Sequence, residues 1–412
     1  MANVNTNVKD AGNIICKLAA GRFQEKPLFC NSIVEQDSSV LEGKNGYKSG
    51  DTVKINVPPI YAEHTSFDIT SNIQDSVETT KDLDIDIISN VAMKVDTLEL
   101  ATETDFASFM TRFGNSAIDR IAAGVELRVL EKCTDAVYQS VGTAGTEQFV
   151  YDTFGHAKQK LDEQLAPTED RYTLMDAYAM RKATNSAKGY LNPQGGISKM
   201  YESGMIKDPI TGFDFMQNQM LNVHTNGNDV VFEVRTTVSV EGQATLVVEG
   251  LTTTTGTVTK GTVFTVDSVF DVDPLTKTTL TSLKQFTVTA DATADGSGFA
   301  TLSISPALYT SASAGLQTVS AFPVDGDAII PVGAASTANT QNIAYQKSAF
   351  RFISVPLVMP KNEELVGQYT EGGITIALIR FFDGNKHEWV TRFDFLGGVA
   401  VVRPEWATRI TA

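Results

Sequence analysis

The sequence has 412 residues, a length that corresponds to two or three domains of about 100–200 residues each. Hydrophobic residues make up 42% and charged residues 20%, which is close to ordinary globular usage. The formal net charge of −16, from 33 basic and 49 acidic residues, argues against a nucleic-acid-binding protein, because such proteins need a basic face to displace counterions from phosphate.

Three cysteines, Cys16, Cys30 and Cys133, are widely spaced and form no CxxC motif. They predict neither a disulfide framework nor a zinc site, and they favour synthesis in a reducing cytosol. The polar N-terminus lacks the apolar core of a signal peptide. No apolar run approaches the ~18–20 residues needed to cross a bilayer, so we expect no membrane partner.

The first hundred residues predict an arm followed by a β-rich excursion. Residues 1–42 carry a weak helical stripe and are read as an N-terminal arm, which either reaches a neighbour or packs on its own domain. Within 43–100, apolar and polar residues alternate in 50–57 and again in 82–95, the period-2 pattern of strands. The polar stretch 61–81 between them predicts a long loop, of a length that is usually functional.

The clearest helical pattern covers residues 102–140. Thr102 and Asp105 resemble a capping box, and apolar residues then recur at 3.6-residue spacing. The predicted helix exceeds ~30 residues, or about 45 Å at 1.5 Å per residue. The residues of the stripe are Phe106, Phe109, Met110, Phe113, Ala117, Ile118, Ile121, Val125 and Val129.

The second half of the chain changes character twice. Residues 154–222 predict mixed α/β structure, with a helix that ends before Pro167. Residues 226–345 are rich in Thr, Val, Ser and Gly and contain short alternating runs, which predict an inserted all-β domain, a small barrel or sandwich, in preference to a disordered segment. Residues 346–412 read as strands that complete the sheet begun before the insertion.

The sequence offers little chemistry. The four histidines, His64, His156, His224 and His387, have no metal-ligand spacing, and no Walker, GxSxG or GxGxxG motif is present. The alternating aspartates of 82–86 could bind Ca²⁺, but a solvated strand face explains them more simply. We therefore predict no catalytic residue, no cofactor and no metal.

Short motifs in a fixed order resemble one protein family. Asn192-Pro193-Gln194 opens a loop and is followed by Gly204-Met-Ile and Gly212-Phe-Asp. Residues 349–356 and Arg403-Pro-Glu come later. These segments resemble the Asn-Pro-Gln loop, the Asp-Gly-Thr-Ile segment, the Gly-Phe-Asp turn and later strands of the coat proteins of short-tailed Salmonella phages. Each patch is short, and their shared order gives them weight.

The resemblance implies an α+β chain with the Hong Kong 97-type fold of tailed-phage major capsid proteins and an inserted all-β barrel domain. It implies an N-terminal arm at 1–42, an extended β-loop region at 43–100, a peripheral domain with the spine helix and the start of the axial domain at 101–225, an insertion domain at 226–345, and a return to the axial and peripheral core at 346–412. The implied function is self-assembly into pentamers and hexamers of an icosahedral head that encloses double-stranded DNA.

The implied partners are other copies of this chain, a scaffolding protein and a portal protein, while the binding of decoration proteins is open. The packaged DNA would touch the shell only non-specifically. We expect assembly in the host cytoplasm and a final place in the virion. The residues predicted to contact a neighbouring subunit lie on the strands that flank the extended loop: Thr52, Val53, Lys54, Ile55, Lys81 and Asp82.

Two alternatives come from other classes. A β-rich phage tail or adhesin surface protein would account for the Thr/Val-rich segment, but it predicts no long helix at 104–140. An enzyme with unfamiliar active-site residues predicts a stable monomer or small oligomer in place of a shell.

Overall fold

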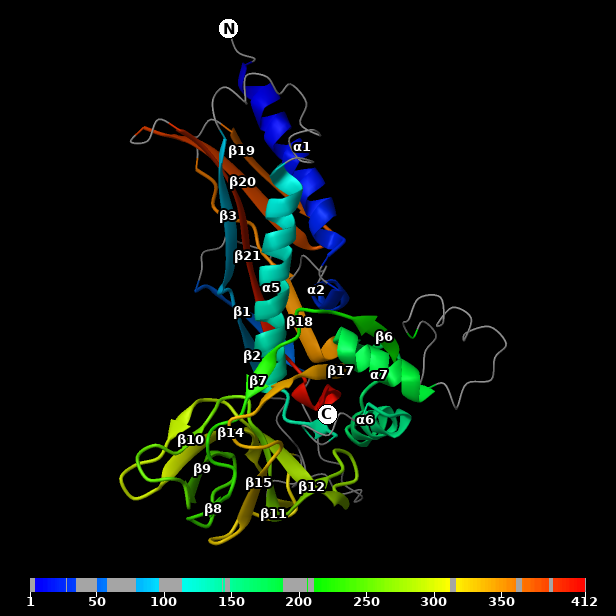
Figure 1. Cartoon of the computed structure of the whole chain (residues 1–412), viewed down its shortest axis with the longest axis vertical. Helices are drawn as coiled ribbons and strands as arrows, with labels where there is room; N and C mark the ends of the chain where they lie inside the picture. The colour runs from blue at the N-terminus through cyan, green and yellow to red at the C-terminus, as the bar shows by residue number, and fades with distance from the viewer. Residues whose placement is uncertain are drawn as a thin grey trace, which may run out of the picture. The chain divides into compact units, whose positions relative to one another are not determined.

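The computed structural model divides the chain into two compact units (Figure 1). The first comprises Met1–Asn56, Thr80–Leu130 and Phe350–Val402, and the second comprises Val57–Thr79, Glu131–Ala349 and Arg403–Ala412. The structure describes residues 4–26, 28–34, 50–57, 79–95, 113–142, 144, 149–187, 206, 211–311, 316–360, 365–384 and 388–411.

A five-stranded antiparallel sheet forms the framework of the first unit. Its order is β18 (Phe350–Ser354), β21 (Glu388–Val401), β20 (Ile374–Asp383) and β19 (Leu365–Glu371), and β3 (Ile87–Val95) also pairs with β21. The pairing of β3 with β21 confirms that the final segment completes a sheet begun before residue 100. Strands β19 and β20 are joined through Gly372 and Gly373, both at positive φ, as a tight hairpin turn requires.

Helices of the first unit pack on this sheet. Helix α1 (Val4–Gln24) lies along β19 and β20, and α2 (Leu28–Ile33) follows it. Phe23 of α1 is fully buried and stacks on Phe395 of β21, with ring centroids 5.5 Å apart. The described part of the predicted arm therefore packs on its own unit.

Helix α5 (Asn115–Ala136) carries the middle of the predicted spine helix. Ile118, Ile121, Val125 and Val129 are buried along one stripe, as the 3.6-residue spacing predicts. The first part of the prediction, including the Thr102 capping box, lies outside the described residues. The predicted end at 140 is wrong, because the helix stops at Ala136 and strand β4 (Ser140–Val141) begins.

A second five-stranded sheet lies in the second unit, in the order β4, β22 (Ala407–Ile410), β17 (Asn342–Gln346), β5 (Arg171–Met175) and β6 (Asp214–Gln217). All five residues of the central strand β17 are buried. Residues 403–410 were predicted to form a strand. The strand begins only at Ala407, and the 3₁₀ turn η5 (Pro404–Trp406) precedes it, because proline has no N–H for a sheet ladder.

Helices α6 (Tyr151–Glu163) and α7 (Ala177–Ala187) belong to the same unit as this sheet. They bury Phe154, Leu161 and Met180 in a core that also contains Met175 of β5. The Asp176 carboxylate accepts a hydrogen bond of 2.6 Å from the Ala179 amide, so it caps the start of α7. Both helices confirm the mixed α/β prediction for this region.

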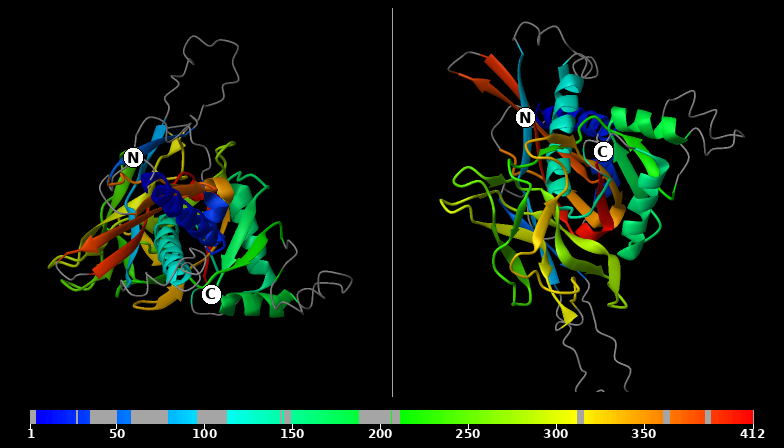
Figure 2. Two further views of the ribbon diagram at one scale, coloured as in Figure 1. Left: turned by 90° about the horizontal axis from the view of Figure 1, so that it is seen from above. Right: turned by 60° about the horizontal axis from the view of Figure 1, so that its bottom comes forward.

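Six strands of the Thr/Val-rich segment close into a barrel, shown from other sides in Figure 2. Its core contains Leu246, Val248, Phe264, Phe286 and Leu302, all fully buried. The strands, in barrel order, are β11 (Val263–Val272), β12 (Thr279–Val288), β14 (Ala300–Leu308), β9 (Gln243–Glu249), β8 (Phe232–Val234) and β15 (Ala328–Pro331).

Shorter elements connect the barrel to the rest of the unit. Strand β7 (Val223–Thr225) leads into it and pairs antiparallel with β16 (Ala338–Thr340), which leads out of it. A small pair, β10 (Thr257–Val258) with β13 (Ala292–Thr293), lies within the segment, and the 3₁₀ turn η4 (Lys347–Ala349) follows β17. The last residues of the predicted 226–345 domain thus belong to β17 of the sheet.

Candidate functional site

Strands β1 (Thr52–Val57) and β2 (Thr79–Asp84) pair with each other and carry all six predicted contact residues. Val53 and Ile55 are 7% and 5% exposed, and they pack in a core cluster of the first unit with Leu83 and Leu396. The inward face of this strand pair is therefore anchored in its own subunit.

The outward face of the strand pair is polar. Thr52, Lys54 and Asp82 are exposed on this face, and Lys81, which strand alternation places on the opposite face with Leu83, is exposed as well. The Thr52 hydroxyl donates a hydrogen bond of 3.0 Å to Asp84 on the opposite strand. The structure thus brings four of the six predicted residues to the surface on a paired, anchored element. Their contact with a neighbouring subunit stays a prediction.

Within the described ranges, no group of three or more His, Cys, Asp and Glu side chains is placed to hold a metal ion. Asp82, Asp84 and Asp86 all face solvent. His156 is exposed, 3.8 Å from Asp152, whereas His224 is half-buried, and His64 and His387 lie outside the described residues. Among the described helices, none has the length and apolar character to cross a membrane.

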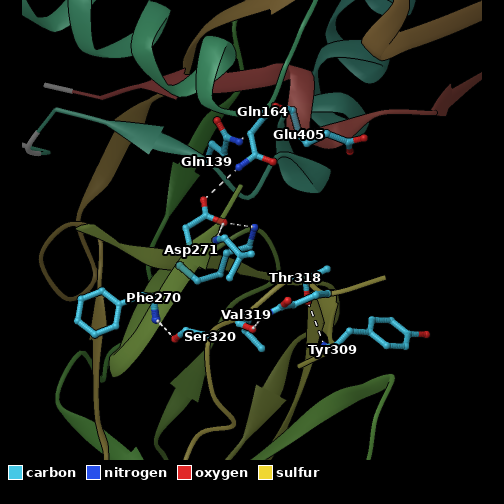
Figure 3. Close-up of polar contacts among 12 residues, drawn as sticks. Gln139, Gln164, Phe270, Asp271, Tyr309, Thr318, Val319, Ser320 and Glu405 are labelled. Carbon is cyan, nitrogen blue, oxygen red and sulfur yellow. Dashed lines mark hydrogen bonds and ion pairs between the residues drawn. The ribbon is translucent and has the colours of Figure 1, made fainter. Parts of the chain in front are cut away.

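A buried ion pair lies at the base of the barrel, where β11 and β12 meet the end of α6. The Lys284 ammonium is 2.9 Å from an Asp271 carboxylate oxygen, and both side chains are at most 5% exposed. Gln164, directly after α6, donates a hydrogen bond of 3.1 Å to the other oxygen of Asp271 (Figure 3). The carboxylate therefore has partners from the barrel and from the helix.

Tyr138, in the segment between α5 and β4, lies beside this ion pair. The Lys284 ammonium is 5.1 Å from the centroid of its ring, a cation–π distance. Burial raises the pKa of the Tyr138 hydroxyl well above its ordinary value, and the Glu405 and Asp271 carboxylates raise it further. The phenol is therefore neutral, and the lysine is the cation of the group.

Arg409 of β22 provides a second link to the barrel. Its guanidinium donates hydrogen bonds to the carbonyl oxygens of Gly261 at 2.6 Å and Asp135 at 3.2 Å, and to the Thr287 hydroxyl at 3.3 Å. Burial lowers the pKa of Arg409 to about 10, partly offset by Asp135, so the side chain is still charged at neutral pH. One cation thus joins the sheet, the barrel and the end of α5.

A reciprocal amide contact completes this region. Gln285 of β12 accepts a hydrogen bond from the Ser140 amide and donates one to the Ser140 carbonyl, each at 2.9 Å. The neighbouring residue Gln139 donates a hydrogen bond of 3.2 Å to the Glu405 carbonyl oxygen in η5 (Figure 3). We call the contacts of Asp271, Lys284, Gln164, Gln285 and Arg409 the barrel joint. Polar side chains hold it together.

The sequence matches one family model, described as "P22 coat protein - gene protein 5", over residues 34–409. The chain belongs to the P22 coat protein family. This coat protein is therefore a major capsid protein of an icosahedral bacteriophage head, and its place is the virion. Copies of the chain assemble with one another into the capsid.

Several solved capsids resemble the coat protein at low sequence identity. The capsid of Ralstonia phage GP4 gives a TM-score of 0.48 at 8% identity, covering 93% of this chain and 90% of that one. A chain of Mycobacterium phage Che8 gives 0.46 at 12% identity, covering 93% and 91%. The mature capsid of bacteriophage PhiM1 gives 0.41 at 9%, covering 92% and 90%. Among curated proteins, none matches the coat protein sequence.

Sequence analysis missed the barrel joint of the coat protein. A signal was present, because Asp271 lies two residues after the buried Val269 and Lys284 lies two residues before the buried Phe286. Strand alternation places such charged residues on the core-facing side, where a charge requires a partner. Alternation does not identify the partner, and Gln164 comes from a helix more than a hundred residues away in sequence.

Proposed function

We propose that this coat protein subunit has the Hong Kong 97-type capsid fold with its barrel as an inserted domain. The paired strands β7 and β16 support this, because the chain enters and leaves the barrel side by side. The barrel also has an apolar core of its own. An insertion of this kind can be accommodated by the sheet that receives it, since the two connecting ends are adjacent.

The assembly we propose uses pentamers and hexamers that enclose double-stranded DNA, and the family match over residues 34–409 carries this proposal. One sequence must then accept slightly different neighbours. Many weak contacts per subunit are sufficient, because shell closure multiplies them. Such contacts are heterologous, and they close around symmetry axes.

The strand pair of β1 and β2 is the contact surface that we favour. Val53 and Ile55 fix it to the subunit core, while Lys54 presents a cation and Asp82 an anion to solvent. A surface with both signs of charge can select partner and register through complementary charges. The loop between the two strands lies outside the described residues.

Other partners follow from the proposed assembly. We propose that a scaffolding protein directs the shell, that a portal protein occupies one vertex, and that assembly takes place in the host cytoplasm before DNA is packaged. The subunit acts as a structural protein in this scheme and performs no catalysis. Decoration proteins stay an open possibility for the outer surface.

Electron microscopy of the purified wild-type chain, with scaffolding protein supplied, tests the assembly function. We expect closed shells, and a chain that forms only monomers or small oligomers under these conditions would contradict the proposal.

The contact surface has a separate test in Lys54→Glu. Because this change reverses an exposed charge, we expect a folded subunit by circular dichroism and at least a tenfold loss of shells in sucrose gradients. Lys158→Glu is the matched control, since Lys158 is an exposed lysine of α6 far from the strand pair in sequence. Normal shell yield from Lys54→Glu would rule out β1 as a contact surface and leave the assembly function standing.

A further inference from the structure

A small cavity of about 10 Å³ lies at the base of the barrel, within the second unit. Its lining comes from four separate places in the fold: the strand β4, the paired strands β7 and β16, the barrel and the strand β22. Polar residues predominate in this lining, and among them are Ser140, His224, Asn226, Asn339, Gln341 and Arg409.

Arg409, which lines this cavity, has one buried nitrogen for which the described part of the chain offers no hydrogen-bond partner. The Arg409 Nε atom is fully buried and unpaired, although the other guanidinium nitrogens donate to Gly261, Asp135 and Thr287. Leaving a buried donor of a charged group unsatisfied costs at least as much as a lost hydrogen bond. A native structure therefore needs a partner for this N–H.

We propose that this cavity is a binding site for one ordered water molecule, which accepts a hydrogen bond from Arg409 Nε. The cavity has room for a single water, and internal waters occupy polar cavities of this size when they have two to four partners. The side-chain amides of Asn339 and Gln341 contain carbonyl oxygens that can accept the protons of this water.

Water fits the site better than a small anion. A halide ion is larger than water, and about 10 Å³ leaves no margin for it. The Arg409 charge also has an electrostatic partner in Asp135, whose carboxylate raises the pKa of the guanidinium and lies 3.3 Å from the Lys260 ammonium. A neutral molecule that accepts one hydrogen bond and donates two matches what the site requires.

The bound water would complete the barrel joint. It would connect Arg409 of β22 with Asn339 of β16 and with Gln341 through hydrogen bonds that no described side chain supplies. Water-mediated hydrogen bonds of this kind are nearly as favourable as direct ones. One ordered water molecule would thus be part of the folded subunit.

A density map of the full wild-type chain at about 2 Å, from crystals of the subunit or from assembled shells, tests the site. We expect a peak about 2.7–3.2 Å from Arg409 Nε, the range for an N–H···O hydrogen bond. Thr173 Oγ1 is an internal control, because it is also buried and unpaired but does not line this cavity. An empty cavity, or peaks of equal height beside Arg409 and Thr173, would overturn the proposal.

A second preparation in sodium bromide distinguishes water from an anion. Bromide scatters far more strongly than water, so an anion site would give a clearly higher peak in bromide than in chloride. We expect the same peak height in both salts. A peak that rises in bromide would show that the site binds an anion and would overturn the assignment of water.

Discussion

Lys284 and Asp271 stabilise the barrel joint only as a pair. Each charge is removed from water, and the desolvation cost is offset by their 2.9 Å contact and by the hydrogen bond from Gln164. Losing one partner leaves the other buried without an opposite charge. The joint should therefore be far more sensitive to a single substitution here than to loss of both charges together.

Lys284→Met keeps the length of the side chain and removes its charge. We expect the free energy of unfolding to fall by ~3–5 kcal/mol, because Asp271 then remains as a buried carboxylate with neutral hydrogen-bond donors but no opposite charge. Urea unfolding of the unassembled subunit, followed by circular dichroism, measures the change. The double variant Lys284→Met, Asp271→Leu is the control, and it should recover most of the loss. A single variant as stable as the wild type would contradict this account of the joint.

His224 gives the stability of the subunit a pH dependence. Burial lowers the pKa of His224 below its ordinary 6.5, Arg409 lowers it further, and Asp135, Asn226 and Asp291 oppose the shift. The unfolded chain therefore binds a proton at a higher pH than the native subunit. Stability from this residue is complete above pH 6.5 and falls as the pH drops from 6.5 to the native pKa.

Urea midpoints at pH 7.5, 6.5 and 5.5 measure this dependence. We expect His224→Gln to flatten the decline of the midpoint between pH 6.5 and 5.5 relative to the wild type. His156→Gln, at an exposed position of α6, should leave the decline unchanged. Equal slopes for the wild type and His224→Gln would show that burial of His224 does not contribute.

At the scale of elements, two glycines fix helix α1 against strand β19. A Cβ atom on Gly12 would lie 2.9 Å from the Val366 carbonyl oxygen, and one on Gly367 would clash with the Gly12 carbonyl carbon. Both contacts are with backbone atoms, which cannot rotate away. The close approach of helix and strand therefore depends on the absence of side chains at these positions.

Gly367→Ala should force α1 away from the sheet. We expect faster amide hydrogen exchange in residues 12–24 and faster proteolysis there, because the buried side chains of α1 lose their packing. Gly155→Ala in α6 is the matched control, since a Cβ there meets nothing within 4 Å. That change should stabilise the subunit by ~0.5–1 kcal/mol through helix propensity. Unchanged exchange in Gly367→Ala would contradict the close approach.

For the whole molecule, the net charge of −16 opposes assembly, because every subunit repels its neighbours. Salt should weaken this repulsion, since the Debye length falls from about 10 Å at 0.1 M to about 3 Å at 1 M. We expect association of the purified chain alone, measured as the initial rate of light scattering, to be faster at 1 M than at 0.1 M sodium chloride. A slower rate at high salt would show that complementary charges at the contacts outweigh the overall repulsion.

Much of the local structure could be predicted from residue periodicity. The 3.6-residue stripe that includes Ile118 and Val125 identified α5, and alternation identified β1, β3 and most barrel strands. Two local errors had local causes. Val137 and Tyr138 fit a helical stripe as well as a buried connecting segment, and Pro404 begins a 3₁₀ turn where the alternation favoured a strand.

The candidate site was less predictable. Alternation shows that Val53 and Ile55 share one face of β1 and that Thr52 and Lys54 share the other. It does not show what the apolar face packs against. The choice depends on Leu396, more than three hundred residues later in the chain. The buried partner of Arg409 depends in the same way on a distant segment, because Gly261 lies more than a hundred residues earlier in the chain.

The sequence by itself determined the types of elements, the all-β character of the Thr/Val-rich segment and, through the order of short motifs, the family. These features depend on local backbone preference and on the spacing of apolar residues, and both can be read from residues that are close in sequence. Only the tertiary structure decided which strand faces are buried, how the barrel is joined to its sheet and why Arg409 requires a further hydrogen-bond acceptor. Burial and charge compensation depend on groups brought together from distant parts of the chain, and no local pattern specifies them.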